Sequence, residues 1–417
     1  MVVRKGYKQT EIGEIPENWE FRSLSDITKK IADRDHFTPT YTEKGIPIIS
    51  PKDIDDDMHL RLDNVKYITQ EAHEKNYKKT DIKPLDIIFS RIGAGLGKSI
   101  LVDENFYHFS ILHSLCQIRT NQSVIPQYLL YFLRSNLIQK RIWVTVQSIG
   151  VPDLGLKEIG NLPIFVPPLG EQQKIATLLS DIDLKIQKQQ EYKSKLETLK
   201  KGLMQELLTG KRRLEGFSED WENTELGELG YFSKGKGIKK DEISDSGFSC
   251  IRYGEIYTKY DTYVTQPISH ISKNIVKSSY KIKTGDILFA GSGEDEFDIG
   301  KCIVYLGNDE CYAGGDIIVF TPFNDNPLFL SYLLNSKNIK KQMTSMAQGD
   351  MVVHIYSSHL KSIFLQIPSS NEEQSEIAKI LSDMDCEIEA LEKQRDKYIN
   401  LKQGMMQKLL TGEIRLV

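Results

Sequence analysis

Residues 171–214 read EQQKIATLLSDIDLKIQKQQEYKSKLETLKKGLMQELLTGKRRL, and residues 373–416 read EQSEIAKILSDMDCEIEALEKQRDKYINLKQGMMQKLLTGEIRL. The two stretches align without a gap at a constant offset of 202, and about half of their 44 positions are identical. The units of solenoid proteins are roughly 20–50 residues long. A period of 202 residues therefore indicates a duplicated half-protein.

Both stretches are predicted to form long helices. They are rich in Leu, Ile, Lys, Glu and Gln, contain no proline, and follow Pro167-Pro168 in the first copy and Pro368 in the second. A helix over residues 175–208 would be roughly 50 Å long at 1.5 Å per residue. The apolar face of such a helix must be buried against a partner.

The apolar residues of each helix recur with the alternating four- and three-residue spacing of a coiled-coil seam. The helix-packing residues predicted from this spacing are Ile175, Leu179, Ile182, Ile186, Ile377, Leu381, Met384 and Ile388. Charged residues occupy later core positions of the same heptads, namely Lys193, Lys200, Arg395 and Lys402. Leu196, Leu199 and Leu203 indicate a shift of register near the middle of the first helix. Polar residues on a seam lower its stability but fix its register and partner.

The duplicate of each helix is its predicted partner, because two long helices separated by a globular domain can return to pack as an antiparallel coiled coil. The alternative is that each helix docks on its own domain. Gly202 and Gly404 lie at the same point of the two helices, where glycine costs roughly 1 kcal/mol relative to alanine. Close approach of another backbone, from this chain or from a partner protein, is one reason for glycine there.

Length and composition are those of a globular protein with several domains. A chain of 417 residues with 40% hydrophobic and 27% charged residues can form two to four domains, each with its own core. No apolar run approaches the roughly 18 residues of a membrane span, and no signal peptide is recognised, so a cytoplasmic location without a membrane partner is expected. The 5 cysteines form no CxxC pair, which predicts free buried thiols and no zinc site.

The charge is unevenly distributed. The formal net charge is −4, which argues against a simple nucleic-acid binder. Residues 171–214 contain 10 basic and 6 acidic residues, whereas residues 215–370 contain 15 basic and 21 acidic residues, a net charge of −6. If the chain binds DNA, local basic patches must make the contacts.

One globular region of about 140 residues precedes each of the two helical stretches. Trp19 and Trp221 open them at the same offset of 202 and are expected to anchor each region to its core. By this correspondence the C-terminal IRLV should lie near the N-terminal segment, closing a pseudo-cyclic arrangement with approximate two-fold symmetry. Residues 83–90 and 283–290 match as turn and strand, and residues 126–135 and 327–336 match as a helix.

The predicted fold class is α+β: two globular mixed α/β domains separated by two long helices that form an antiparallel coiled coil, as a pseudo-two-fold internal repeat. Short β-rich runs such as IPIIS, KCIVYL and GDIIVF favour a partly antiparallel sheet. The predicted segments are residues 1–168, the first domain; 169–214, the first helix; 215–367, the second domain; and 368–417, the second helix.

The residues that resemble catalytic or metal-binding motifs do not have the spacing that those motifs require. No catalytic or metal-binding residue is therefore predicted. GAGLGKS, residues 93–99, is not a Walker loop, because Ile92 stands where that motif requires glycine. Residues 291–302 form a similar glycine-rich loop that also presents a lysine, and either a nucleic-acid contact or a plain turn fits both loops. His354 and His359 have no companion metal ligands.

Basic clusters with polar or aromatic neighbours are the candidate DNA contacts, through phosphates or base edges. In the first domain they are Arg34, Lys52, Tyr77, Lys78, Lys79, Arg91, Lys98 and Ser148, and in the second Lys234, Lys236, Lys239, Lys240, Arg252, Lys277 and Lys301. For each residue alone, an ordinary solvated surface charge is the alternative.

The stretch VPPLGEQQKIATLLSDID, the stretch LKKGLMQELLTGKRRL, their second copies and the tryptophan-containing opening of each globular region resemble the specificity subunit of type I restriction-modification systems. The resemblance covers the whole chain. It implies two target-recognition domains, each of which reads one half of a bipartite double-stranded DNA site. It also implies that the two helices set the spacing and bind two modification subunits.

The resemblance places the chemistry on partner subunits. The modification subunits carry S-adenosylmethionine and methylate adenine, and a restriction subunit that uses ATP and Mg²⁺ translocates and cleaves DNA. No cofactor is therefore expected in this chain, which also lacks a [DN]PP[YF] methylation motif. The alternative function is a coiled-coil scaffold that binds no DNA, which the acidic second domain favours.

Overall fold

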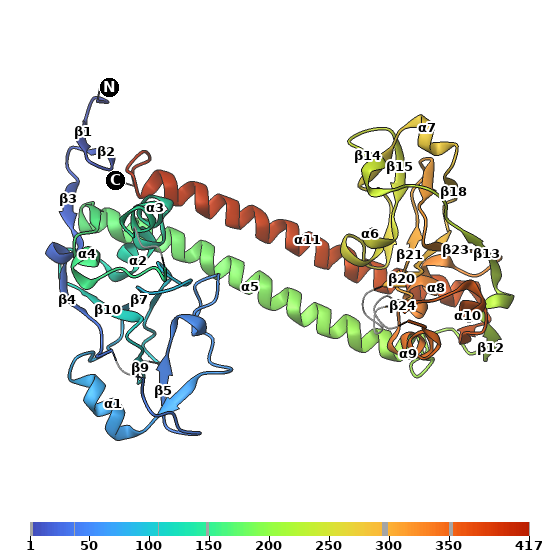
Figure 1. Ribbon diagram of the computed structural model, residues 1–417, viewed down its shortest axis with the longest axis horizontal. Coiled ribbons are helices and arrows are strands. Elements are labelled where there is room, and N and C mark those ends of the chain that lie inside the picture. Colours follow the sequence, from blue (N-terminus) through green and yellow to red (C-terminus); the bar gives the residue numbers. More distant parts are fainter. Residues whose placement is uncertain are drawn as a thin grey trace. The chain divides into compact units, whose positions relative to one another are not determined.

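The computed structural model describes residues 3–36, 38–106, 108–146, 150–293, 299–349 and 353–416 (Figure 1). The chain divides into a first unit, Met1–Gln190 with Lys393–Val417, and a second unit, Glu191–Glu392. Each unit therefore contains one globular domain, the beginning of one long helix and the end of the other.

The two long helices are α5, Leu169–Leu207, and α11, Asn371–Leu409, each of 39 residues. In the first unit Lys402 of α11 pairs with Asp183 of α5, and in the second unit Lys193 of α5 pairs with Glu392 of α11. In both units the beginning of one helix thus lies beside the end of the other. The predicted antiparallel coiled coil is confirmed (Figure 1).

The first domain is built on small, mainly antiparallel sheets. Its strands are β1 Tyr7–Thr10, β2 Gly13–Pro16, β3 Glu20–Ser23, β4 Thr28–Ala32, β5 Ile46–Ile49, β6 Lys66–Ile68, β7 Ile87–Ser90, β8 Ser99–Leu101, β9 Ser110–Ile111, β10 Leu115–Thr120 and β11 Pro163–Val166. Its helices are α1 Gln70–Tyr77, α2 Pro126–Arg134, α3 Asn136–Thr145 and α4 Leu156–Gly160. The strand orders are β4-β10-β7-β8 and β6-β5-β9, with the pairs β1-β2 and β3-β11.

The second domain repeats this plan with additions. Its strands are β12 Trp221–Glu225, β13 Gly230–Lys234, β14 Ile243–Ser244, β15 Phe248–Ile251, β16 Tyr263–Val264, β17 Ser269–Ile271, β18 Tyr280–Ile282, β19 Ile287–Ala290, β20 Ser292–Gly293, β21 Cys302–Tyr305, β22 Cys311–Ala313, β23 Ile317–Pro322, β24 Val353–His354 and β25 Phe364–Pro368. Its helices are α6 Tyr253–Thr258, α7 Lys273–Val276, α8 Pro327–Leu334, α9 Lys337–Met346 and α10 Ser357–Lys361. The order β13-β23-β19-β21-β16 contains the counterpart of β4-β10-β7-β8, and β17-β15-β22 that of β6-β5-β9. The α+β fold and its duplication are confirmed.

Each domain also holds the end of the helix from the other copy. Leu409 and Leu410 lie in the first core, and Leu207 and Leu208 in the second. In the first unit the Tyr7 hydroxyl donates to the Gly412 carbonyl at 2.8 Å, so the C-terminal segment lies near the N-terminal one, as predicted.

Gly412 is required at this closure for two reasons. Its φ of 70° is in the left-handed region that favours glycine. A Cβ atom there would also lie 2.5 Å from Pro16 and 3.3 Å from the Trp19 ring.

The predicted seam has two different partners along its length. Ile175 and Leu179 are buried in the core of the first domain, and Ile377 and Leu381 in that of the second. The alternative that each helix docks on its own domain is thus right for the first turns. A single apolar stripe serves both contacts, because burial against a domain or a helix requires the same periodicity.

The predicted register shift is wrong. Leu196 is buried and continues the heptads, whereas Leu199 is 56% exposed. Lys193 and Lys200 remain on the seam, with side chains only 15% and 11% exposed, because their apolar stems are covered while their ammonium groups reach carboxylates. Ile182 is buried, and Ile186, Met384 and Ile388 are half-buried.

Within the described residues, nothing would lie within 4 Å of a Cβ atom added at Gly202 or Gly404. The expectation that another backbone of this chain approaches these glycines is therefore wrong.

Candidate nucleic-acid interface

Several predicted contacts of the first domain are exposed beside loops. Lys52 lies in a short 3-10 helix, Pro51–Asp53, and Lys78 and Lys79 directly follow α1. The Lys79 ammonium group pairs with Asp35. Lys98 is less available, because its Nζ atom lies 2.7 Å from Asp56 Oδ1 and donates to the Ile54 carbonyl.

Two predicted contacts, Arg91 and Arg34, are buried in the first domain. The Arg91 guanidinium donates to the Leu154 carbonyl at 3.1 Å and to the His113 carbonyl at 3.0 Å, and it pairs with Asp153 at 3.1 Å. Arg34 is 1% exposed. Neither can reach DNA in this conformation, so their prediction as exposed contacts is wrong: counting basic residues does not separate a surface cation from one that binds buried carbonyls. Ser148 lies outside the described residues.

The structure brings together most of the predicted lysines of the second domain. Lys234 is the last residue of β13, and Lys236, Lys239 and Lys240 lie in the segment that follows; all four are exposed. A Cβ atom at Gly237 in this segment would lie 3.3 Å from the carbonyl oxygen of Ser278, the residue after the exposed Lys277. These lysines form one exposed basic cluster at loops.

Arg252 and Lys301 instead make internal contacts. Arg252 Nη2 lies 2.9 Å from Glu255 Oε1, and Lys301 Nζ donates to the Tyr260 carbonyl at 2.7 Å. The lysines of both glycine-rich loops, Lys98 and Lys301, thus bind backbone carbonyls of their own domains. For these two lysines the contacts favour the plain-turn interpretation, and residues 294–298 of the second loop lie outside the described residues.

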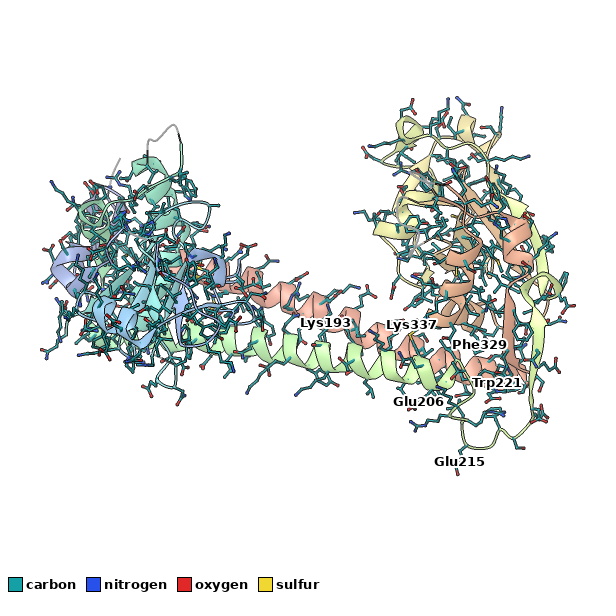
Figure 2. All side chains as sticks on the ribbon, turned by 60° about the horizontal axis from the view of Figure 1, so that its bottom comes forward. Lys193, Glu206, Glu215, Trp221, Phe329 and Lys337 are labelled. Atoms are coloured by element: carbon teal, nitrogen blue, oxygen red, sulfur yellow. The ribbon has the colours of Figure 1, made fainter. Side chains whose placement is uncertain are left out.

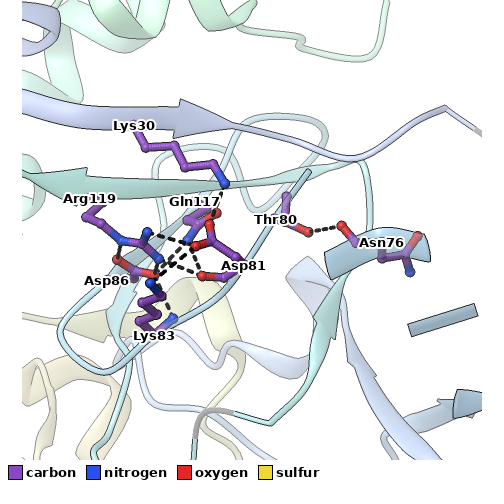
Figure 3. A network of polar contacts seen from close by, with 8 residues as sticks. All are labelled: Lys30, Asn76, Thr80, Asp81, Lys83, Asp86, Gln117 and Arg119. Carbon is purple, nitrogen blue, oxygen red and sulfur yellow. Dashed lines mark hydrogen bonds and ion pairs between the residues drawn. The ribbon is translucent and has the colours of Figure 1, made fainter. Parts of the chain in front are cut away.

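A polar network crosses the sheet of the first domain (Figure 3). Arg119 on β10 pairs with Asp86 at 2.8 Å and with Asp81 at 3.0 Å, Gln117 donates to Asp86 at 2.6 Å, and Lys30 on β4 pairs with Asp81. Burial raises the pKa of Asp81, but the hydrogen bonds from Lys30 and Arg119 outweigh it, so this pKa is lowered. The hydrogen bonds to Asp86 and Asp81 raise the pKa of Arg119. Both carboxylates form ion pairs with neighbouring cations. Neither is therefore suited to act as a general base or as a metal ligand.

Sequence reasoning missed the contacts that join helix to domain. In the first unit the Tyr131 hydroxyl donates to Asp183 at 2.7 Å, and Lys402 Nζ lies 2.6 Å from the same carboxylate and 5.5 Å from the centre of the Tyr131 ring. We call this set the first triad. The second triad is Tyr332, Asp385 and Lys200, with the hydroxyl 2.6 Å from the carboxylate and the ammonium group paired with it.

The triads tie three elements to one another. Each tyrosine comes from a helix of the domain, each aspartate from the long helix that follows it, and each lysine from the other long helix. Burial, then the carboxylate nearby, raises the pKa of both tyrosines, which keeps the hydroxyls protonated as donors. Lysines at core positions of the heptads were the signal in the sequence, because each requires a buried counter-charge.

A second joint holds each helix start. Glu171 binds Arg415 through two hydrogen bonds of 2.7 and 2.8 Å and accepts from the Trp19 indole at 3.0 Å. Burial raises the pKa of Glu171, but the bonds from Arg415 and Trp19 outweigh it and lower this pKa. Glu373 binds Arg213 in the second unit with the same two distances.

The described part of the chain lacks two further kinds of site. None of its helices has the length and apolarity needed to cross a membrane. Its His, Cys, Asp and Glu side chains form no group of three that could hold a metal ion.

Known proteins resemble this chain over its full length. A Methanocaldococcus jannaschii chain, proposed to be the specificity subunit of the type I restriction enzyme MjaX, is 29% identical over 441 residues, which cover 99% of this chain and 97% of the relative. The specificity subunit of the type I restriction enzyme MjaVIII from the same organism is 25% identical over 449 residues, which cover 100% and 99%.

Solved structures share the fold. The S subunit of a type I restriction-modification system from M. genitalium matches with a TM-score of 0.61 at 16% identity, covering 94% of this chain and 96% of that one. A chain from a structure of type I R-M complex assembly and conformational transition matches with a TM-score of 0.55 at 18% identity, covering 96% and 99%.

The family model for the type I restriction modification DNA specificity domain matches residues 16–198 and again residues 218–401. Each match contains one globular domain and most of the long helix that follows it. Because the two matches cover most of the sequence, the chain belongs to the family of the type I restriction modification DNA specificity domain and carries that domain twice.

Proposed function

We propose that this chain is the DNA-specificity subunit of a type I restriction-modification complex. Each domain reads one half of a bipartite double-stranded DNA site, and the coiled coil fixes the number of base pairs between the halves. The observation that carries the proposal is that one scaffold occurs twice with the same helix joints, Glu171 with Arg415 and Glu373 with Arg213, but with different loops. A shared scaffold with diverged loops suits two unlike ligands.

A rigid spacer suits DNA recognition for a geometric reason. Equivalent positions on one side of B-DNA recur every 10–10.5 base pairs, so two domains on one rod can face only half-sites with a defined spacing. The exposed loop lysines, Lys52, Lys78 and Lys79 in the first domain and the basic cluster in the second, are proposed to contact phosphates. Each mismatched base pair in a half-site should cost roughly 1–3 kcal/mol of binding energy.

The chemistry is proposed to belong to partner subunits. Two modification subunits bind the helices and methylate adenine with S-adenosylmethionine, and restriction subunits that use ATP and Mg²⁺ join them in the cytoplasm. The exposed faces of the long helices around Gly202 and Gly404 are open to such partners. Glycine presents no side chain to an approaching helix, and this supports the alternative that a partner protein explains these two residues.

The test is co-expression with the neighbouring methyltransferase-like protein, followed by mapping of adenine methylation across host DNA. We expect a bipartite motif. Exchanging residues 28–165 with those of a related chain should change one half of the motif, and exchanging residues 230–366 should change the other half. No methylation would favour the scaffold function. A continuous motif whose sequence stays the same after one of the two exchanges would mean that only one domain reads DNA.

A further inference from the structure

The second unit contains a groove of about 1050 Å³ between the end of α5 and the helix α9. Figure 2 marks this region with Lys337, at the start of α9, and Glu206, near the end of α5. Its lysines are Lys200, Lys201, Lys211, Lys337, Lys340 and Lys341, and its acidic residues are Glu197, Asp261 and Asp385. The groove is therefore basic, although residues 215–370 carry a net charge of −6.

Most of the positive charge of the groove is not neutralised. Lys200 is paired with Asp385. Lys201, Lys211, Lys337 and Lys341 are exposed, and within the described ranges none of these four forms an ion pair. Four free ammonium groups around one groove repel one another, so an anionic ligand that lies among them would relieve that repulsion.

The duplicated scaffold does not require this groove to be basic. Helix α3 is the counterpart of α9, and an offset of 201 aligns Lys337 with Asn136 and Lys340 with Gln139. Thr344 and Ser345 of the groove align with Trp143 and Val144, which are 48% and 65% exposed. Lys337 and Lys340 are thus specific to the second unit, whereas Lys341 aligns with Lys140 and is shared by both copies.

We propose that this groove binds the phosphate backbone of double-stranded DNA beside the half-site of the second domain. Among the described residues, the lining contains lysines, Asn335, Asn338 and Ser345, and none of the lining residues is aromatic. A site for unpaired bases needs aromatic surfaces for stacking, whereas phosphates need cations and neutral donors. The groove adds affinity without reading sequence, and this inference rests on the proposed function.

The test compares two variants of the full chain in complex with its modification subunits. Lys337→Gln with Lys341→Gln removes two charges from the groove. Lys361→Gln with Lys379→Gln removes two exposed charges of the same unit that lie outside it. Binding to a duplex that carries the mapped motif is measured between 50 and 200 mM salt.

We expect the groove variant to bind more weakly. The negative slope of log K against log salt should become less steep by about 2, which is close to one for each lysine that no longer neutralises a phosphate. The methylated motif should not change, and the control variant should keep the original slope. An unchanged slope in the groove variant would overturn the inference. So would an unchanged slope with fewer modification subunits in the complex, which would make the groove a docking site for an acidic protein surface. Absence of a bipartite motif in the unaltered complex would instead overturn the proposed function itself.

Discussion

The two units hold their long helices with the same residues but build their sheets with different polar contacts. At the helix joints the glutamate–arginine pairs and the two triads match residue for residue, and the glutamate–arginine and tyrosine–aspartate distances agree within about 0.1 Å. In the sheets, Arg119 of β10 corresponds to Thr321 of β23, and Gln117 to Val319. Asp86 therefore meets a guanidinium, whereas Asp286 accepts a neutral hydroxyl at 2.5 Å.

This difference shows which contacts the architecture depends on. Each domain is joined to both long helices, and the same joints occur in both copies. The polar interior of a sheet only has to satisfy its own buried groups, and a network of ions or a single neutral hydrogen bond can do so. The joints and the sheets can therefore be tested separately.

The largest effect is expected from shortening the rod. Deleting residues 187–193 from α5 and 389–395 from α11 removes one heptad from each helix and keeps the phase of the seam. The coiled coil becomes about 10 Å shorter, which corresponds to about 3 base pairs of B-DNA. Methylation mapping should show a shorter gap between unchanged half-sites or no methylation at all. Altered half-site sequences would contradict the role of the helices as a spacer.

The next effect compares the two buried aspartates. Asp86→Asn removes the charge that Arg119 faces and should destabilise the first domain by about 2 kcal/mol. Asp286→Asn keeps an acceptor for Thr321 and should cost less than about 1 kcal/mol. Hydrogen exchange of β7 and β10, compared with β19 and β23, measures each local free energy of opening.

The Arg119→Thr substitution gives the matched control for this comparison. In the Asp86→Asn background it removes a cation that keeps only Asp81 of its two carboxylate partners, and it should recover part of the missing stability. Equal losses in the two domains, or no recovery, would show that the charge of Arg119 is not what distinguishes the sheets.

A smaller effect is expected at the triads. Lys200 and Asp385 are 11% and 16% exposed, whereas Lys402 and Asp183 are 20% and 31% exposed. A double-mutant cycle with alanine should give a coupling energy of about 1–2 kcal/mol for the first of these pairs and about 0.5–1 kcal/mol for the second, because solvent screens the more exposed pair. A larger value for Lys402 with Asp183 would show that burial does not set the strength of these joints.

The sequence predicted the duplication, the antiparallel helices and the closure of the chain, because a repeat and a heptad pattern can be recognised directly from the order of the residues. It did not predict the triads, because Tyr131 and Asp183 lie 52 residues apart and become neighbours only after folding. The predicted register shift failed for a related reason. Leu199 looked like part of a new seam, whereas the true seam contains Lys200, whose charge is neutralised by a distant aspartate.

Candidate contacts were predicted less well than the fold. Arg91 and Lys52 are both basic residues near loops, but only the fold shows that Arg91 is buried and binds carbonyls while Lys52 is exposed. Charge in a sequence gives the type of partner that a residue can bind and does not give its position. The groove lysines were missed because they come from α5 and the segment after it and from α9, more than 100 residues further along the chain.

The smallest effect concerns pH and the first sheet. The pKa of Asp81 is lowered in the folded chain, so its contribution to stability is complete above the unfolded pKa of about 3.9 and is lost as the pH falls toward the folded value. Between pH 5 and about pH 3 the opening free energy of β4 and β10 should therefore fall. Arg119→Thr removes one of the two cations that lower this pKa, so the variant should show a shallower fall over the same range. An equal slope in both proteins would mean that Lys30 and Lys83 hold the Asp81 carboxylate in its charged form, and the first sheet would then depend on pH without its arginine.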